Sequence, residues 1–177
     1  MCIRDRPLTL DGARAGQKLV AHGKIGYSGA GLALLQRFGR ALPPELEELW
    51  PLIDAHCAPT LSPGRGVIAR ATGSTAMTDN SDGLVRDVGH LAQRSGVRID
   101  LDRAAIAPDP LLAAAGAVLD IDPWEWVLTG GEDHTLLATT YKAAPSGFRE
   151  VGRVMRGTGV TISGEEPRYR EGWEGFA

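Results

Sequence analysis

A short strand that turns directly into a helix at an acidic segment constrains the fold of this chain more than any other feature. Residues 75–78 are compatible with a strand, and Asp79, Ser81 and Asp82 follow directly. Downstream, apolar side chains recur at helical spacing on one face until Gly96, which is a typical C-cap residue. The sequence therefore predicts a strand–turn–helix unit with its polar side chains at the start of the helix.

The polar residues at this turn have two interpretations. The start of a helix presents unpaired N–H groups that suit phosphate oxygens. Carboxylates at the same place would repel phosphate unless hard cations such as Mg²⁺ lay between them, so the combination indicates a metal–phosphate site. Asp and Ser are also ordinary N-cap residues, and one of these side chains could simply cap the helix.

A second motif, Gly130-Gly131-Glu132-Asp133-His134, follows an apolar helical run and precedes a strand-like segment. Together the two motifs resemble the C-terminal half of thiamine-monophosphate kinases, which belong to the AIR-synthase-related (PurM-like) superfamily. The family segments Ala-Met-x-Asp-x-Ser-Asp-Gly-Leu, Asp-x-x-His-Leu-Ala, Ile-Asp-Leu, Leu-x-Gly-Gly-Glu-Asp-His and a terminal Gly-Trp motif have counterparts here at residues 76–84, 87–92, 99–101, 128–134 and 172–176. Their shared order and spacing make the resemblance specific.

The predicted elements indicate an α+β fold. Their order is too irregular for a doubly wound sheet and too helical for a sandwich, so we expect a mixed β-sheet with flanking helices. The resemblance implies the same architecture, that of the C-terminal domain of the AIR-synthase-like superfamily. The expected strands lie near residues 19–25, 75–78, 97–101, 135–141, 151–155 and 160–163, and the expected helices near 28–39, 46–53, 67–71, 84–96, 111–119 and 123–128.

The side chains expected to face the core follow helical spacing. In the first expected helix, Leu32, Leu35 and Phe38 are predicted to point inward, and Ser28 to act as the N-cap rather than as a nucleophile. In the second, Trp50 belongs to the predicted apolar stripe, although Pro51 should kink or shorten that helix.

The resemblance implies an activity and assigns residues to it. The expected reaction transfers the γ-phosphoryl group of ATP to thiamine monophosphate, giving thiamine diphosphate. By position, Asp79 and Asp82 correspond to metal-binding aspartates of the catalytic site, and Ser81 to a serine that contacts the nucleotide. Glu132 and Trp173 correspond to residues that hold the thiamine moiety.

The chemistry of this reaction suits a site rich in carboxylates. The acceptor is a phosphate that is already largely ionised at neutral pH, so no general base is required. The task is to bring two anions together, which calls for several Mg²⁺ ions and close positioning. Two other functions stay open: a sister ATP-dependent synthetase of the same superfamily, and a stand-alone nucleotide-binding or interaction module. Glu132 could also cap a turn, and Trp173 could simply anchor the tail.

The expected domain organisation follows from where the resemblance begins. Residues 1–6 are interpreted as a cloning or assembly scar, 7–25 as the rest of an inter-domain segment, and 26–177 as the C-terminal domain. The N-terminal half of the family supplies most metal-binding aspartates, nucleotide contacts and the homodimer interface, so we expect this chain to be inactive alone. Leu10, where many members carry an arginine, and Gly175, where a histidine is usual, depart from the pattern.

Charge and composition narrow the classes of partner and cellular location that we expect for this chain. The net charge is −3 without a basic run, so we expect neither a nucleic-acid nor a membrane partner. No apolar stretch reaches the roughly 18 residues that a membrane-spanning helix needs. Two cysteines cannot form a disulfide framework, and reduced thiols in the cytoplasm are the expectation.

Overall fold

Strands from both ends of the chain form one six-stranded sheet. The computed structural model describes residues 7–60 and 62–169. The order across the sheet is β2-β4-β1-β5-β3-β6. Neighbouring strands are antiparallel except for the parallel pair β3 and β6. The strands are β1 (Lys18–His22), β2 (Ala76–Asn80), β3 (Arg98–Leu101), β4 (Thr135–Thr140), β5 (Arg149–Met155) and β6 (Gly159–Ile162).

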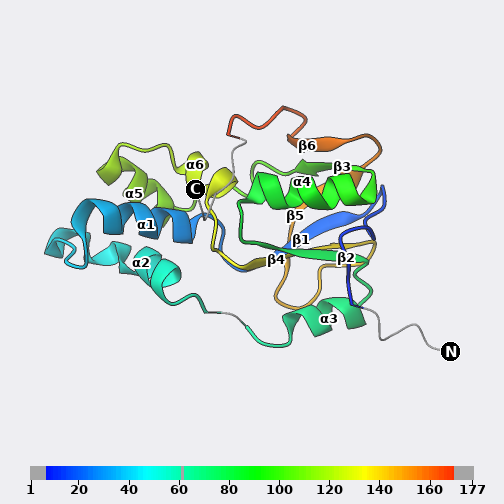
Figure 1. The fold of residues 1–177 in the computed structure, drawn as a ribbon, viewed down its shortest axis with the longest axis horizontal. Coiled ribbons are helices and arrows are strands. Elements are labelled where there is room, and N and C mark those ends of the chain that lie inside the picture. The colour runs from blue at the N-terminus through cyan, green and yellow to red at the C-terminus, as the bar shows by residue number, and fades with distance from the viewer. Residues whose placement is uncertain (1–6, 61, 170–177) are drawn as a thin grey trace.

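Helices cover the sheet and extend beyond one of its ends. Figure 1 shows α4 along one side of the sheet, α3 on the opposite side, and the other helices gathered at one end. This mixed arrangement confirms the predicted α+β fold. None of the helices in the described part of the chain is long and apolar enough to cross a membrane. The helices are α1 (Tyr27–Phe38), α2 (Trp50–Cys57), α3 (Arg65–Ala71), α4 (Leu84–Ser95), α5 (Pro110–Leu119) and α6 (Pro123–Thr129), with a 3₁₀ helix, η1, at Pro44–Leu49.

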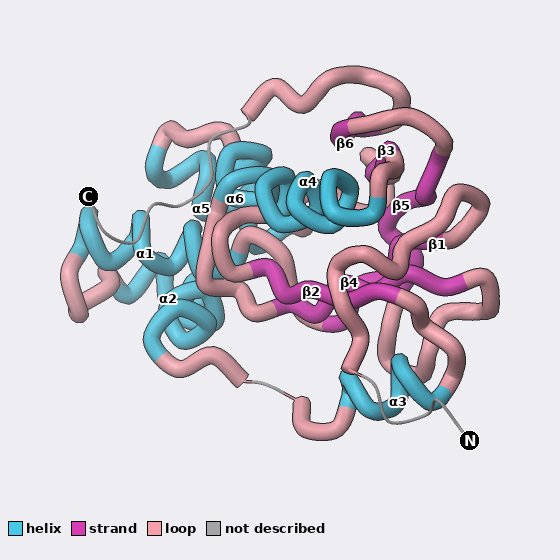
Figure 2. The backbone as a smooth tube through the Cα atoms, turned by 45° about the vertical axis from the view of Figure 1, so that its right-hand side comes forward, coloured by secondary structure: helices cyan, strands magenta, loops and turns pink. Residues whose placement is uncertain are grey.

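The two faces of the sheet pack into separate apolar clusters, as strand alternation requires. In β1, Leu19 and Ala21 belong to the large core shared with α4 and the helical end. Val20, between them, packs with Ala69 of α3 in a smaller cluster. Figure 2 shows α4 and α3 on these opposite sides. The strand predicted near residues 19–25 is observed as β1, which is paired on both sides, with β4 and β5.

The buried face of α1 differs from the predicted one. Leu34 is fully buried together with Ala30, whereas Leu35 and Phe38 only pack partly against the core. The reason is Gly31, where an added Cβ would lie 2.0 Å from the carbonyl oxygen of Leu52. Because Gly31 lets α1 approach the backbone of α2 closely, the face that carries it turns inward.

The second expected helix is two helices. Residues 44–49 form the 3₁₀ helix η1, and Pro51 lies in the first turn of α2, where a missing N–H costs little. Leu49 and Ile53, on either side of the junction, are both buried, so the apolar stripe continues across it except at Trp50. Leu52 is fully buried, and Trp50, predicted to face the core, is 37% exposed.

Candidate functional site

Backbone hydrogen bonds join the two sequence motifs into one site. Strands β2 and β4 are antiparallel neighbours, with Asn80 opposite Thr135. At the end of this pairing, the Glu132 N–H donates to the Ser81 carbonyl at 2.8 Å, and the His134 N–H donates to the Asn80 carbonyl at 2.9 Å. Segments far apart in the sequence are therefore fixed against each other by main-chain contacts.

A histidine lies between the exposed carboxylates of the two motifs. His134 Nδ1 is 3.8 Å from Asp79 Oδ2, and His134 Nε2 is 3.3 Å from Glu132 Oε2. The side chains of Asp79 and Glu132 are 48% and 51% exposed, so both can reach solvent or a ligand. Sequence reasoning gave His134 no role of its own; its place directly after two acids was the available signal.

Asp87 shapes the acidic turn from within α4. Its Oδ2 accepts the N–H groups of Ser81 at 3.0 Å and of Asp82 at 2.9 Å. Burial raises the pKa of the Asp87 carboxyl to about 6, and the nearby charges of Asp82 and Asp79 act in the same direction. Sequence analysis did not single out this residue, although an acid on an otherwise apolar helical face was a signal.

Helix α4 begins at a glycine rather than at one of the polar residues. Its N-cap is Gly83, with φ 115° and ψ 140°, and this position makes no side-chain cap. A Cβ there would lie 2.9 Å from the Thr129 carbonyl oxygen, so glycine allows the end of α6 to approach. The alternative that Asp79, Ser81 or Asp82 serves as the N-cap residue of α4 is therefore wrong.

Asp133 caps α1 from the other motif. Its Oδ2 accepts the Gly26 N–H at 2.6 Å and its Oδ1 accepts the Ser28 N–H at 2.9 Å. The Asn80 side-chain amide donates to Oδ2 at 3.2 Å. The N-cap residue is Gly26, so the prediction that Ser28 caps α1 is wrong; its hydroxyl instead pairs with His56 Nδ1 at 2.9 Å.

The environment of Asp133 opposes its ionisation on balance. Burial raises the pKa of its carboxyl to about 7, although the main-chain N–H donors of α1 and the neighbouring His134 lower it. Asp133 is consequently a structural acid that joins β2, α1 and the segment 130–134.

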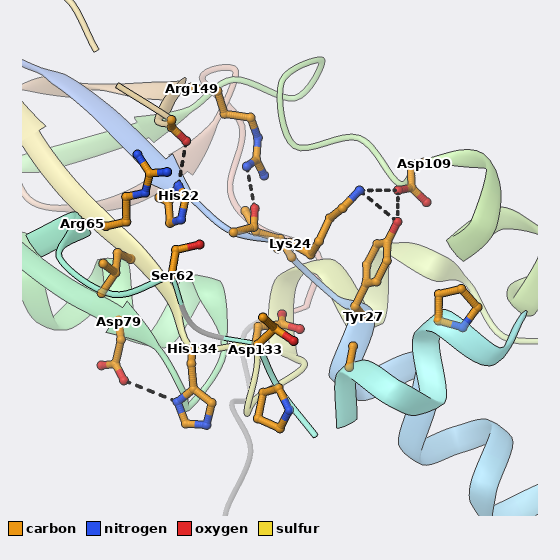
Figure 3. Close-up of a pocket in the computed structure, with 18 of the residues that line it drawn as sticks. His22, Lys24, Tyr27, Ser62, Arg65, Asp79, Asp109, Asp133, His134 and Arg149 are labelled. Atoms are coloured by element: carbon orange, nitrogen blue, oxygen red, sulfur yellow. Dashed lines mark hydrogen bonds and ion pairs between the residues drawn. The ribbon is translucent and has the colours of Figure 1, made fainter. Parts of the chain in front are cut away.

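A cavity of about 1200 Å³ opens beside these residues. Asp79, Asp133 and His134 line one part of it, as Figure 3 shows. Of the residues assigned from sequence, Asp79, Ser81, Asp82 and Glu132 are brought together by the paired motifs, but only Asp79 lines the cavity. Trp173 lies outside the described residues. Further charged or phenolic side chains on the wall are His22, Lys24, Tyr27, Asp54, Arg65, Asp109 and Arg149.

The acidic turn fits part of a metal site. Within the described residues, no group of three or more His, Cys, Asp and Glu side chains could hold a metal ion. The carboxylates of Asp79 and Asp82 nevertheless lie close enough to Asp87 to raise its pKa by their charge. Mg²⁺ is commonly held by one or two carboxylates together with substrate phosphates and water, and this pair matches that donor set.

The relatives found by comparison with known proteins share one name. No family model matches the chain. A thiamine-monophosphate kinase of Corynebacterium glutamicum is 59% identical over 96% of this chain and 51% of the relative, and one of Mycobacterium tuberculosis is 43% identical over 96% and 50%. The solved structure of AaThiL complexed with AMPPCP and TMP superposes with a TM-score of 0.83 at 35% identity, covering 96% of this chain and 54% of that one. The chain thus spans about half the length of the relatives it matches.

Proposed function

Since the chain belongs to the thiamine-monophosphate kinase family, of whose members it spans about half, we propose that it forms part of an ATP-dependent kinase. The reaction moves the γ-phosphoryl group of ATP to the phosphate of thiamine monophosphate and yields thiamine diphosphate. A neighbour of the same fold that was solved with AMPPCP and TMP supports this pair of substrates.

One observation carries the proposal: the two motifs form a single rim through the Glu132-to-Ser81 and His134-to-Asn80 main-chain hydrogen bonds. These main-chain bonds bring residues 80–81 and 132–134 together, which supports a shared site for the residues assigned to metal, nucleotide and thiamine. A phosphoryl transfer needs its donor and acceptor held close together, and positioning is the main contribution that a protein makes to it.

Each residue of the rim has a proposed role. Asp79 and Asp82 contribute carboxylate ligands to Mg²⁺, which neutralises phosphate charge when it is bound. Ser81 contacts the nucleotide. Glu132 attracts the cationic thiazolium of thiamine with its half-exposed carboxylate. Trp173, which lies outside the described residues, packs on the thiamine ring, because a flat cation favours a π face.

The remaining acids of the site hold the rim rather than act as bases. Asp133 accepts main-chain N–H groups of α1 with both of its carboxylate oxygens, and Asp87 accepts those of the turn with Oδ2. No base is required, since the accepting phosphate is already an anion at neutral pH. The chain's own contribution is therefore to bind, orient and fix the spacing of the two anions.

Further parts of the proposal concern the intact enzyme. We propose that a second segment, like the half of its relatives that this chain does not match, completes the metal ligands and forms a homodimer. We also propose that the enzyme works in the cytoplasm with reduced thiols, which fits the exposed and unpaired Cys57.

The test is a thiamine diphosphate assay with Mg²⁺, ATP and thiamine monophosphate. The chain is assayed alone and with the unmatched half of the Corynebacterium glutamicum relative added. D79N and D82N are compared with D120N, an exposed position with φ 56° that asparagine tolerates. We expect activity only in the combined sample, with D79N and D82N lowering it and raising the Mg²⁺ requirement, and D120N leaving it unchanged.

The contrary outcomes separate the alternatives. Nucleotide binding by a stable monomer, without turnover in either sample, would favour the stand-alone module. Phosphorylation of a different acceptor would favour a sister synthetase. Full activity of the chain alone would contradict the need for a second segment.

A further inference from the structure

Two arginines on the cavity wall lack a carboxylate partner. Within residues 7–60 and 62–169, the ion pairs of the cavity involve other cations: Lys24 faces Asp109 at 3.8 Å and His134 faces Asp79 at 3.8 Å. Arg65 instead donates Nη1 to the Ser146 carbonyl at 3.0 Å, and Arg149 donates Nη1 to the Gly23 carbonyl at 2.6 Å. Each guanidinium is thus anchored by a neutral acceptor and keeps its charge uncompensated.

Both arginines lie beside the same two short segments. His22 Nδ1 pairs with the Gly147 oxygen at 2.7 Å, and Gly23 follows His22 in the chain. A Cβ added to Gly147 would lie 2.9 Å from Arg65 Nη1 and 3.3 Å from His22 Nδ1. Figure 3 draws Arg65, His22 and Arg149 together on one side of the cavity. Residues from β1, α3 and β5 therefore converge on one place.

The position of Arg149 adds to this concentration of positive charge. Burial lowers the pKa of its guanidinium, which remains charged at neutral pH because arginine starts from a very high value. Arg149 is nonetheless an exposed residue at the start of β5, so an anion in solution can reach its guanidinium. The acids that line the cavity lie elsewhere on its wall: Asp54 on α2, Asp109 at the start of α5, and Asp79 and Asp133 in the paired motifs.

We propose that Arg65 and Arg149, with His22, form a subsite for the phosphate group of a phosphate ester. A guanidinium presents parallel N–H donors that match two phosphate oxygens, and each arginine here spends only one nitrogen on its anchoring carbonyl. The subsite shares its cavity with Asp79, so the inference rests on the proposed function in naming a phosphorylated ligand. Thiamine monophosphate and the nucleotide both carry the required group.

The competing explanation is that both arginines only fasten loops. Arg65 would hold the turn between β4 and β5, and Arg149 the segment after β1, without contacting a ligand. A fastening role predicts loss of stability without loss of phosphate recognition. Glutamine replacements test this, because the glutamine amide can still donate to a carbonyl while the positive charge is removed.

The experiment measures binding to this chain by calorimetry with two matched ligand pairs. Thiamine monophosphate is compared with thiamine, and AMPPCP with adenosine. The variants are R65Q, R149Q and, as control, R70Q, an exposed arginine on α3 outside the cavity. We expect R65Q and R149Q each to weaken the phosphorylated member of one pair by about tenfold, as loss of a charge-assisted hydrogen bond does. Thiamine, adenosine and R70Q should show no such change.

The ligand pair whose phosphorylated member binds more weakly to the variants shows whether the subsite holds the phosphate of thiamine monophosphate or that of the nucleotide. The subsite would be overturned if R65Q and R149Q bound both phosphorylated ligands as tightly as wild-type protein does. It would also be overturned if neither phosphorylated ligand bound wild-type protein. R65Q and R149Q are also assayed in the completed enzyme. If neither variant changes turnover, the phosphate subsite is overturned and the proposed kinase activity is not. The charge-retaining R65K and R149K variants, with thermal unfolding measured in parallel, separate a folding defect from lost recognition.

Discussion

Helices α5 and α6 begin in a different way from helices α1 and α4, which start beside the two paired motifs. Helix α5 starts after Asp109, whose Oδ1 accepts the Leu111 and Leu112 N–H groups at 3.1 Å, and α6 starts after Asp122, which caps Trp124 at 3.1 Å. Helices α1 and α4 start at glycines with no side chain to cap them.

Beside the site the missing caps come from distant residues or from inside the helix. Asp133 caps α1 from the second motif, and Asp87 holds the turn before α4 from within the helix itself. The comparison teaches that a local cap needs no residue of the motifs, even though the carboxylate that caps α5 also accepts the Tyr27 hydroxyl of α1. A helix capped by a motif residue is fixed relative to the site, because one carboxylate sets both positions.

The largest expected effect comes from removing the distant cap. D133A leaves the Gly26 and Ser28 N–H groups of α1 and the Asn80 amide without their shared acceptor. We expect the free energy of unfolding to fall by about 3 kcal/mol, measured by urea denaturation at pH 6. D54A, on an exposed face of α2, is the control and should change it by less than about 0.5 kcal/mol. A loss for D133A no larger than that of an ordinary cap would remove the distinction between the two regions.

The pH dependence of stability sharpens the same contrast. The pKa of Asp133 is about 7 in the folded protein against 3.8 in the unfolded chain, so folding favours its protonated form. Its contribution is greatest below pH 4 and is lost as the pH rises to about 7. Relative to wild-type protein, D133N should therefore gain about 2 kcal/mol between pH 5 and pH 8, in denaturation curves at both values. D120N should follow wild-type protein throughout.

Removing the acid inside α4 should have an intermediate effect. D87A frees the N–H groups of Ser81 and Asp82, which lie at a half-buried turn where water can replace part of the lost bonding. We expect a loss of about 1.5 kcal/mol and faster amide hydrogen exchange at residues 81–82. Unchanged exchange there would mean that the backbone alone holds the acidic turn.

The smallest effect is expected at the locally capped helices. D122A removes the N-cap of α6 and the acceptor of the Tyr169 hydroxyl; it should cost about 1 kcal/mol, because the cap dominates and water can replace the acceptor of the partly exposed phenol. Asn at the same position should restore most of it, measured by thermal unfolding. A loss as large as that of D133A would mean that local and distant caps are equivalent here.

The contrast also explains which features the sequence could predict. Helices α5 and α6 carry their start signals, Asp followed by Pro, next to their apolar runs, and the expected ranges 111–119 and 123–128 lie close to the observed ones. The joining of the two motifs could be expected only through the family resemblance, since the main-chain bonds between residues 80–81 and 132–134 have no local sequence signature.

Where the sequence prediction failed, the cause was long-range. Ser28 is a residue type that often caps helices, but here its own N–H donates to the carboxylate of Asp133, 105 residues away. The inward face of α1 depended on the approach of α2 at Gly31, which spacing within a single helix cannot reveal. His134 and Asp87 gained their roles from partners that the fold supplies.

In the short segment between α6 and β4, successive side chains point to different partners. Glu132 and His134 adopt left-handed backbone angles, φ 62° and 51°, and their side chains meet, while Asp133 between them bonds to α1. Inserting or deleting one residue here would shift these positions, so that the place against α1 would pass from Asp133 to a neighbouring side chain. The length of this segment should therefore tolerate change less than its composition, and a graft of the site onto another scaffold would have to carry it whole.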